Sequence, residues 1–360
     1  MPSKPREKKK SAVNRVPAVE TREIPLVGHA RVLEQLSEAI TKGRLGHAFL
    51  FVGPDGVGKH RLARHIAQSL LCERSDVRKL QPCGQCSSCA MVRAGTHPDL
   101  LQVAKPEEKS ELPIAMIQAL TAQLSLKPAR GSRKIAIVNN ADDLNEESAN
   151  AFLKTLEEPP PGSLLILIAR SLESQLPTIQ SRCQVARFFL LSDDEVARIL
   201  LDLGKVGSAE QARLWAHAAQ GSVAKAIEWA KPEWQELVET MVESLAQQPI
   251  TSHQLTARLL PFIDEAGKES ASKRERARLV VERLLGLLRE ALRASCGSFD
   301  SGEPGIPAGR LDVDLLADMI ERTLDTDYHL QRMAAIPLSI ETWLDDLARL
   351  DEGRHLDPIF

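Results

Sequence analysis

Residues 47–71 read HAFLFVGPDGVGKHRLARHIAQSLL, and this stretch decides the fold of the first half of the chain. A short apolar run at 48–52 leads into a glycine-rich turn, and a segment with apolar residues at helical spacing follows the turn. The order predicts a strand, a loop and a helix. The turn fits the pattern G-x-x-x-x-G-K, whose glycines let backbone N–H groups surround phosphates at the amino end of a helix.

The residues predicted to bind nucleotide in this turn are Gly53, Gly56, Gly58, Lys59 and His60. Lys59 is expected to reach the outer phosphates of ATP or ADP. The motif normally continues with Ser or Thr, whose hydroxyl holds Mg²⁺, but His60 stands there, and imidazole is a poor ligand for a hard cation. The sequence therefore predicts a phosphate cradle that lacks its usual metal ligand. A chance glycine-rich turn is the alternative.

Length and charge limit the function classes. A chain of 360 residues suggests two or three domains, and a hydrophobic fraction of 43% permits sizeable cores. Seven basic and three acidic residues give 1–25 a local charge of +4, which leaves the other 335 residues at −7. We expect 1–25 to be a disordered basic tail that either contacts nucleic acid or an acidic partner or only aids solubility.

Aromatic residues make up only 4% of the chain, with a single tyrosine, which argues against a stacking platform for single-stranded bases. No apolar run approaches the roughly 18 residues that a membrane span needs, and the amino terminus has no apolar signal core. The expectation is a cytoplasmic protein with no membrane partner.

Strand and helix patterns alternate up to residue 191. A parallel sheet covered by helices on both faces is therefore expected. Its further strands are predicted at 99–103, 135–138, 164–168 and 185–190, and its helices at 30–42, at 114–126 and from Asn145 to the prolines at 159–161. Beyond 192 the pattern is helical, with short helices at 193–203, 209–220 and 223–229 and more helix from 231 onward, interrupted by a loop at 297–309.

Four of the six cysteines lie in one excursion at 72–97: Cys72, Cys83, Cys86 and Cys89. Two overlapping C-x-x-C units and a fourth thiol at a helix end suit tetrahedral Zn²⁺. With no open coordination position, such a site is structural. A redox dithiol and inert thiols are the alternatives. Cys296, on a helical stretch, is expected to be a small buried hydrophobic residue.

The residues expected beside the cradle differ from those of a P-loop enzyme that hydrolyses nucleotide. In P-loop enzymes a carboxylate at the end of a neighbouring strand holds the metal, and a further residue orients water. The strand at 135–138 ends instead at Asn139 and Asn140, which are neutral. Asp142 and Asp143 follow and are interpreted as turn residues.

Four segments together resemble one known family. They are NAFLKTLEEPP at 150–160, LPTIQSRC at 176–183, the cradle GPDGVGK at 53–59 and the four-cysteine excursion. The combination is similar to the delta-prime subunits of the bacterial DNA polymerase III clamp loader, within the AAA+ superfamily. The resemblance covers residues 25–350 and is weaker after 230.

The resemblance implies a P-loop NTPase (AAA+) α/β domain with a five-stranded parallel sheet at 26–191, a small helical lid at 192–231 and an all-α collar at 232–360. It also implies a ring of five subunits in which neighbours share active sites. Arg182, in the motif Ser-Arg-Cys, then acts in trans on ATP held by an adjacent motor subunit, where a guanidinium stabilises charge on the phosphoryl oxygens. An ordinary surface arginine is the alternative. Cys183 is left with a packing role.

Several positions differ from the pattern of the motor subunits. His60 replaces the hydroxyl, Asn139 and Asn140 replace the acids, Ala169 stands where motors carry a polar sensor, and Ala224 ends a lid segment that usually ends in arginine. Together these changes argue that the chain has lost its own ATPase activity, although the cradle can still hold ATP or ADP.

The sequence thus predicts a non-hydrolysing clamp-loader subunit that completes the ring and supplies Arg182 in trans. Its partners are expected to be motor and delta-type subunits, the sliding clamp and, through the complex, primed DNA. One alternative is an ATP-hydrolysing motor subunit of the same complex. The other is a zinc-containing nucleic-acid-binding adaptor, against which the −7 charge of residues 26–360 weighs.

Overall fold

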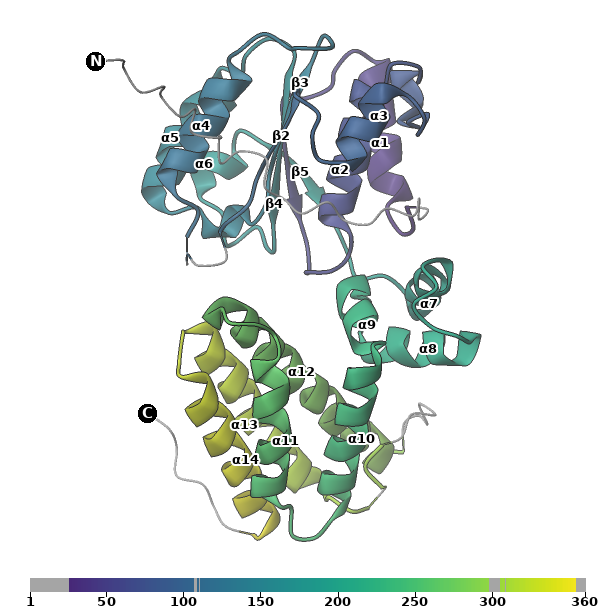
Figure 1. Cartoon of the computed structure of the whole chain (residues 1–360), viewed down its shortest axis with the longest axis vertical. Coiled ribbons are helices and arrows are strands. Elements are labelled where there is room, and N and C mark those ends of the chain that lie inside the picture. Colours follow the sequence, from purple (N-terminus) through teal and green to yellow (C-terminus); the bar gives the residue numbers. More distant parts are fainter. Residues whose placement is uncertain (1–25, 107–108, 110, 298–304, 308, 354–360) are drawn as a thin grey trace, which may run out of the picture. The chain divides into compact units, whose positions relative to one another are not determined.

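The computed structural model describes residues 26–106, 109, 111–297, 305–307 and 309–353, and the chain divides into two compact units at Leu191 (Figure 1). The first unit extends to Leu191 and the second begins at Ser192. The basic tail predicted at 1–25 and most of the loop predicted at 297–309 lie outside the described residues.

The first unit alternates helices and strands in the predicted order. Its elements are α1 (Ala30–Thr41), β1 (Ala48–Val52), α2 (Lys59–Leu71), η1 (Val77–Lys79), α3 (Ser87–Arg93), β2 (Leu100–Val103), α4 (Ile114–Leu124), β3 (Lys134–Val138), η2 (Ala141–Asp143), α5 (Glu146–Glu157), β4 (Ser163–Ala169), α6 (Pro177–Gln180) and β5 (Gln184–Arg187). The structure adds the short helices α3 and α6, which the sequence did not predict.

The five strands form one parallel sheet in the order β2-β3-β4-β1-β5. Every residue of β1, β2 and β3 is buried, as expected for strands covered on both faces. Helices α1, α2 and α3 cover one face, and α4, α5 and α6 cover the other (Figure 1). The predicted doubly covered parallel sheet is confirmed.

The last strand is shorter than predicted. We expected it at 185–190, but β5 ends at Arg187, because its only neighbour in the sheet, β1, ends at Val52, which pairs with Arg187. Phe188 is buried, whereas Phe189 and Leu190 are 70% and 53% exposed. The apolar run at 185–190 therefore indicated that an edge strand is present but not that it ends at Arg187.

Local signals placed α5 correctly. Asn145 is its N-cap, and the Asn145 side-chain oxygen accepts a hydrogen bond of 2.9 Å from the N–H of Ser148. Glu146 and Glu147 occupy the first turn, where carboxylates stabilise the helix dipole. The helix ends at Glu157, two residues before the prolines.

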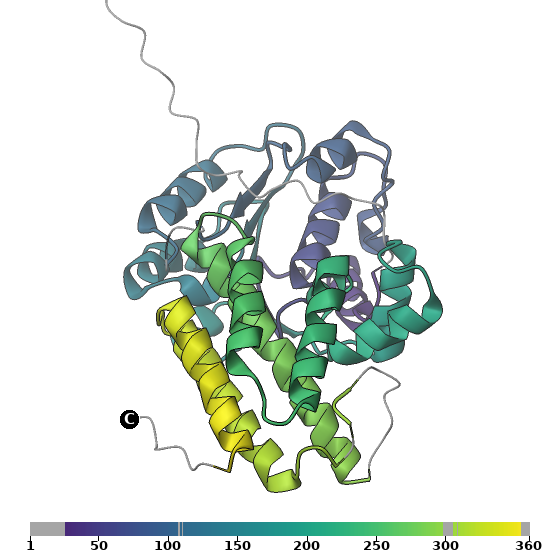
Figure 2. The same ribbon diagram turned by 60° about the horizontal axis from the view of Figure 1, so that its bottom comes forward.

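The second unit is helical throughout its described residues. It contains α7 (Asp193–Asp202), α8 (Ala209–Ala218), α9 (Val223–Trp229), α10 (Pro232–Ala246), α11 (Ser252–Asp264), α12 (Ser270–Ser295), α13 (Val313–Gln331) and α14 (Ile336–Asp351). The helices from α10 onward, green to yellow in Figures 1 and 2, lie side by side as a bundle. The segments predicted as lid and collar fall within this one unit.

The prediction for Cys296 was wrong. We expected a buried residue, but Cys296 caps the carboxyl end of α12 and is exposed. The helical pattern extends to this residue, and the residues beside it do not indicate that the helix leaves the core there. Among the described residues, no helix is both long enough and apolar enough to cross a bilayer.

Asp351, the last residue of α14, joins that helix to the loop after α10 and to the segment before α13. Its side chain is 1% exposed and accepts two hydrogen bonds of 2.9 Å from the guanidinium of Arg310. Its Oδ2 also accepts from the N–H of Ile250 at 2.9 Å. Asp351→Ala is expected to destabilise the second unit by about 3–5 kcal/mol, because it leaves a nearly buried guanidinium without its counter-charge.

Tryptophan fluorescence during denaturant unfolding measures this effect in the second unit alone, because all four tryptophans, Trp215, Trp229, Trp234 and Trp343, lie in it. Asp345→Ala is the matched control: Asp345 is exposed on the same helix, and its loss should change stability by no more than about 0.5 kcal/mol. Equal unfolding midpoints for the two variants would contradict the prediction.

Candidate functional site

The glycine-rich loop between β1 and α2 has a backbone that only glycine adopts without strain, as Gly58 and Gly53 illustrate. Gly58 is the N-cap of α2 with φ 97°, in the left-handed region. Gly53 has φ 154°, and a Cβ placed on it would lie 2.4 Å from the carbonyl oxygen of Phe188. The loop therefore curls closely over the end of the sheet and presents the amino end of α2, as a phosphate-binding loop requires.

Lys59 is turned onto its own loop. Its ammonium donates to the carbonyl oxygens of Gly53 and, at 2.6 Å, of Pro54, and it lies 3.6 Å from a carboxylate oxygen of Asp55. The residue is only 6% exposed. Burial lowers the pKa of Lys59, and the carboxylates of Asp55 and Asp142 partly offset that effect. A phosphate would have to replace these oxygens around the ammonium.

His60 faces β2 rather than an open coordination position. Its Nε2 lies 3.2 Å from the side-chain oxygen of Gln102. Since an amide oxygen can only accept, Nε2 carries the proton in this pair and has no lone pair for a cation. Burial lowers the pKa of His60, with the bond to Gln102 acting in the opposite direction, so the ring is neutral at pH 7. The lone pair that remains on Nδ1 belongs to a nitrogen ligand, which suits Mg²⁺ poorly, so His60 is no equivalent of the missing hydroxyl.

The strand ends next to the cradle carry neutral side chains. Asn139 and Asn140 follow β3, and Asn140 adopts a left-handed backbone with φ 53°. Ala169 ends β4 and is 1% exposed. None of these three residues supplies a charge for a metal or a base for water.

Asp142 and Asp143 are turn residues in η2, as predicted. The Asp142 carboxylate accepts from the backbone N–H of Arg170 at 2.8 Å and from the side chains of Ser174 and Gln175. Asp143 forms an ion pair of 3.0 Å with Lys105. Both acids are therefore engaged in holding loops at this edge of the sheet.

Arg170 is a site residue that the sequence reasoning missed. It follows β4 directly, is half exposed, and its Nε lies 3.6 Å from Asp55 of the loop and 3.8 Å from Asp142. A cation therefore lies beside the loop, at the place where we had looked for a polar sensor at Ala169. The available signal was a charged residue immediately after a buried strand, since the carboxyl ends of parallel strands lie at the ligand-binding edge of such sheets.

Arg182 lies between α6 and β5, and its side chain is held by its own chain. Its Nε donates to Oε1 of Glu157 at 2.8 Å, and one terminal nitrogen also bonds that oxygen. The other terminal nitrogen donates to the carbonyl of Thr178 at 2.8 Å and to the hydroxyl of Ser181 at 3.1 Å. Among the described residues, these partners all lie outside the cradle.

Cys183 follows Arg182 and packs against the core on the α4–α5 face of the sheet. Burial raises the pKa of the Cys183 thiol to about 12, so the group stays neutral. This is the packing role that we expected for it.

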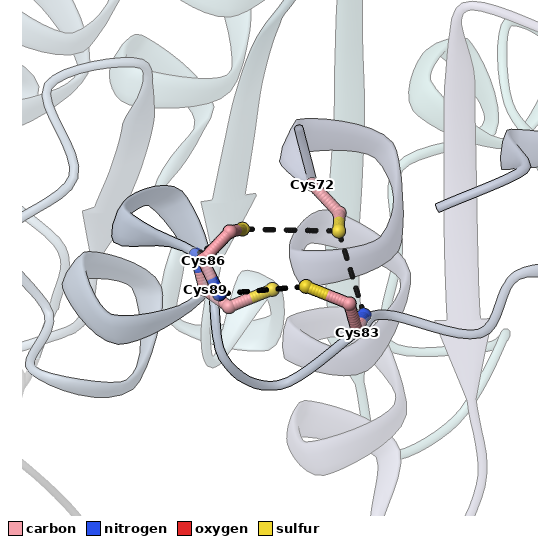
Figure 3. A group of neighbouring side chains, drawn as sticks. All are labelled: Cys72, Cys83, Cys86 and Cys89. Carbon is pink, nitrogen blue, oxygen red and sulfur yellow. Dashed lines mark hydrogen bonds between the residues drawn. The ribbon is translucent and has the colours of Figure 1, made fainter. Parts of the chain in front are cut away.

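The structure brings together Cys72, Cys83, Cys86 and Cys89 (Figure 3). Cys72 caps the carboxyl end of α2, Cys83 lies in the loop, and Cys86 and Cys89 come from the start of α3. Their four sulfur atoms lie within 4.8 Å of one another. Sequence spacing alone had predicted this group.

The donor set fits a metal that prefers sulfur. Four thiolates at about 2.3 Å from Zn²⁺ in a tetrahedron lie about 3.8 Å apart, and the sulfurs of Cys72 and Cys86 are separated by 3.9 Å. The backbone N–H groups of Cys83, Cys86 and Cys89 each point at the sulfur of another cysteine of the cluster at 3.4 Å. Such N–H bonds stabilise thiolates, which are the form that binds metal. The cluster could hold one metal ion.

The cysteine excursion is packed into the first unit rather than appended to it. Leu80 and Val92, which lie within it, are each 2% exposed and belong to the core on the α1–α2 face. Arg64 and Gln68 of α2 donate hydrogen bonds to carbonyls at the end of α3 and at Cys89. Order in the cluster and order in α2 are therefore coupled.

In the second unit, the lid segment that resembled a sensor lies at the start of α9. Ala224 has no group that could contact phosphate, and Lys225 pairs with Glu282 of α12. Lys225 therefore forms an ion pair within the second unit.

Comparison with known proteins identifies related chains. Residues 28–191 match the family described as "DNA polymerase III, delta subunit". DNA polymerase III subunit delta' of Bacillus subtilis is 30% identical over 270 residues, which is 75% of this chain and 79% of the relative. DNA polymerase III subunit tau of Escherichia coli is 34% identical over 207 residues, 56% of this chain and 31% of that protein.

A solved structure shares the fold. A DNA polymerase III gamma subunit-related protein from Thermotoga maritima superimposes with a TM-score of 0.50, at 18% identity, over 89% of this chain and 99% of that one. At this identity the similarity concerns the fold.

Proposed function

This chain belongs to the delta-prime family of DNA polymerase III subunits, and we propose that it is a clamp-loader subunit that does not hydrolyse ATP itself. In this proposal it completes a ring with motor and delta-type subunits and supplies Arg182 to the ATP of a neighbour. The ring then loads the sliding clamp onto primed DNA.

One observation carries the non-hydrolysing part of the proposal. The cradle keeps its backbone and Lys59, but the usual metal ligand and base are missing: His60 is bonded to Gln102, and Asn139 and Asn140 are neutral. The nearby carboxylate of Asp142 is engaged by the N–H of Arg170 and by two side chains. Hydrolysis in P-loop proteins needs both Mg²⁺ and a residue that orients water. In this proposal the cradle can still bind ATP or ADP but does not hydrolyse it.

The trans role of Arg182 is supported by its place and its partners. It lies in a Ser-Arg-Cys motif, and the side chain bonds to groups outside its own cradle. A guanidinium that lies outside its own cradle can serve a phosphate held by another subunit once its present partners release it. We assign the four cysteines to a structural zinc ion, because four sulfur ligands leave no open position for chemistry.

The isolated chain is expected to show no ATP hydrolysis above the level of a Lys59→Ala variant. The physical reason is the missing metal ligand and base around a cradle that otherwise survives. A phosphate-release assay on the purified full chain with Mg²⁺ and ATP tests this. Steady turnover that Lys59→Ala abolishes would instead identify a motor subunit.

Assembly is tested separately. Co-purification with motor and delta-type subunits, followed by mass measurement of the intact complex, should show one copy of this chain in each ring.

A DNA-binding assay tests the alternative of a nucleic-acid adaptor. Tight DNA binding by the isolated chain that is lost on deleting 1–25 or the cysteines would favour this alternative, and such binding should weaken steeply with salt.

A further inference from the structure

Glu157 occupies the side of Arg182 that is best suited to bind an anion. Its Oε1 accepts from Nε at 2.8 Å and from the adjacent terminal nitrogen of the same guanidinium. These two N–H groups form the edge of arginine that pairs with carboxylates and phosphates in a two-point contact.

The remaining contacts use the other terminal nitrogen of Arg182. It donates to the Thr178 carbonyl and to the Ser181 hydroxyl. Four of the five guanidinium N–H groups therefore have partners among the described residues, and all of these partners belong to the same chain. As placed, Arg182 is oriented but not available for a two-point contact with a phosphate.

The pair between Arg182 and Glu157 is accessible to solvent. The two side chains are 30% and 50% exposed. An exposed pair of this kind is weak, because water screens its attraction and both long side chains lose freedom when they pair. A phosphoryl group, which carries more negative charge than a carboxylate, can displace Glu157 from the guanidinium.

We propose that Glu157 is a positioning residue for Arg182: its carboxylate holds the guanidinium on its own subunit and competes for it with the phosphates of the neighbour's ATP. This inference rests on the proposed trans function of Arg182. Glu157 is the last residue of α5, so the end of this helix fixes the position of the carboxylate that holds Arg182.

The competition has a kinetic signature. The pair exists before ATP engages Arg182 and is absent both in the ATP-bound complex and in the transition state. Removing the carboxylate therefore lowers the KM for ATP and leaves kcat unchanged. A purely structural role for Glu157 in α5 would lower kcat or the yield of assembled rings instead.

The experiment compares Glu157→Gln with Glu158→Gln in reconstituted rings, with ATP turnover measured across a range of ATP concentrations. Glu158 is the matched control, because it is exposed and, among the described residues, forms no hydrogen bond or ion pair with Arg182. We expect Glu157→Gln to lower the KM at the site that receives Arg182 by about two- to five-fold, as fits the loss of one exposed ion pair. Glu158→Gln should leave it unchanged.

Adding Arg182→Ala distinguishes a failure of this inference from a failure of the proposed function. In the Arg182→Ala background, Glu157→Gln should have no further effect on KM, because its target is gone. If Arg182→Ala lowers turnover but Glu157→Gln behaves like Glu158→Gln, or lowers kcat, this inference is overturned and the proposed function stands. If Arg182→Ala itself changes nothing, the proposed function is overturned, and the inference with it.

Discussion

ATP turnover at the site completed by Arg182 is expected to fall about 10³-fold when Arg182 is replaced by alanine, with the ring still assembled. In phosphoryl transfer, negative charge on the transferred group's oxygens must be stabilised in the transition state, and a trans guanidinium supplies charge and two hydrogen bonds. The turnover of the whole ring falls by less, because only one site receives this residue. Rapid-quench experiments in the presence of clamp and primed DNA, which stimulate ATP cleavage, measure this fall in rate.

Two further variants identify the chemistry at this position. Arg182→Lys keeps the charge but not the two-point contact, so it should restore only a small part of the rate. Arg187→Ala removes an exposed arginine five residues further along the chain, outside the Ser-Arg-Cys motif, and should leave cleavage unchanged. Undiminished ATP cleavage in rings that contain the Arg182→Ala chain would show that no trans arginine acts from here.

The fold of the first unit could be predicted because its signals are local. An apolar run followed by a glycine-rich turn and a helical pattern identifies β1, the loop and α2 from adjacent residues. Asn145 and the prolines at 159–161 mark the two ends of α5 in the same way. Such features need no knowledge of what the segment packs against.

The end of β5 and the exposure of Cys296 could not be predicted for the opposite reason. The last ladder pair of β5 depends on where β1 ends, 135 residues earlier in the chain, at Val52. Cys296 is exposed because α12 extends past the helices that bury its middle. The residues next to β5 and Cys296 in the sequence indicate neither feature.

The candidate site shows the same division. The cysteine spacing and the glycine-rich motif predicted which residues come together, because both are encoded in short segments. The partners that tune these residues lie far away in sequence: Gln102 is bonded to His60, Glu157 to Arg182, and Arg170 to the loop through Asp55. The sequence does show charged residues at the ends of buried strands and helices. It does not show which of these residues bond to one another.

Purified chain is expected to contain about one zinc ion, and Cys86→Ser is expected to reduce the zinc content to near zero. Cys86 is 2% exposed, and its sulfur lies 3.9 Å from that of Cys72, so a serine oxygen cannot take its place in a set of four soft ligands. Binding of structural zinc is worth about 10–16 kcal/mol in small peptides, so its loss should unfold the excursion. Since Leu80 and Val92 belong to the core, part of the first unit should open with it.

Elemental analysis gives the zinc content, and limited proteolysis shows whether residues 72–97 become sensitive. Cys296→Ser is the matched control: it removes an exposed thiol outside the cluster and should preserve both zinc and protease resistance. If the cluster is instead a redox dithiol, fresh protein handled with reductant and without chelators should contain no metal, and an oxidant should remove cluster thiols in pairs.

Thiol labelling gives a second test. Since zinc holds all four cluster sulfurs as thiolates, and burial raises the pKa of Cys183, only Cys296 should react quickly with a thiol reagent until a chelator is added. Fast labelling of the cluster in untreated protein would therefore rule out a filled metal site, whatever the elemental analysis of the bulk sample gave.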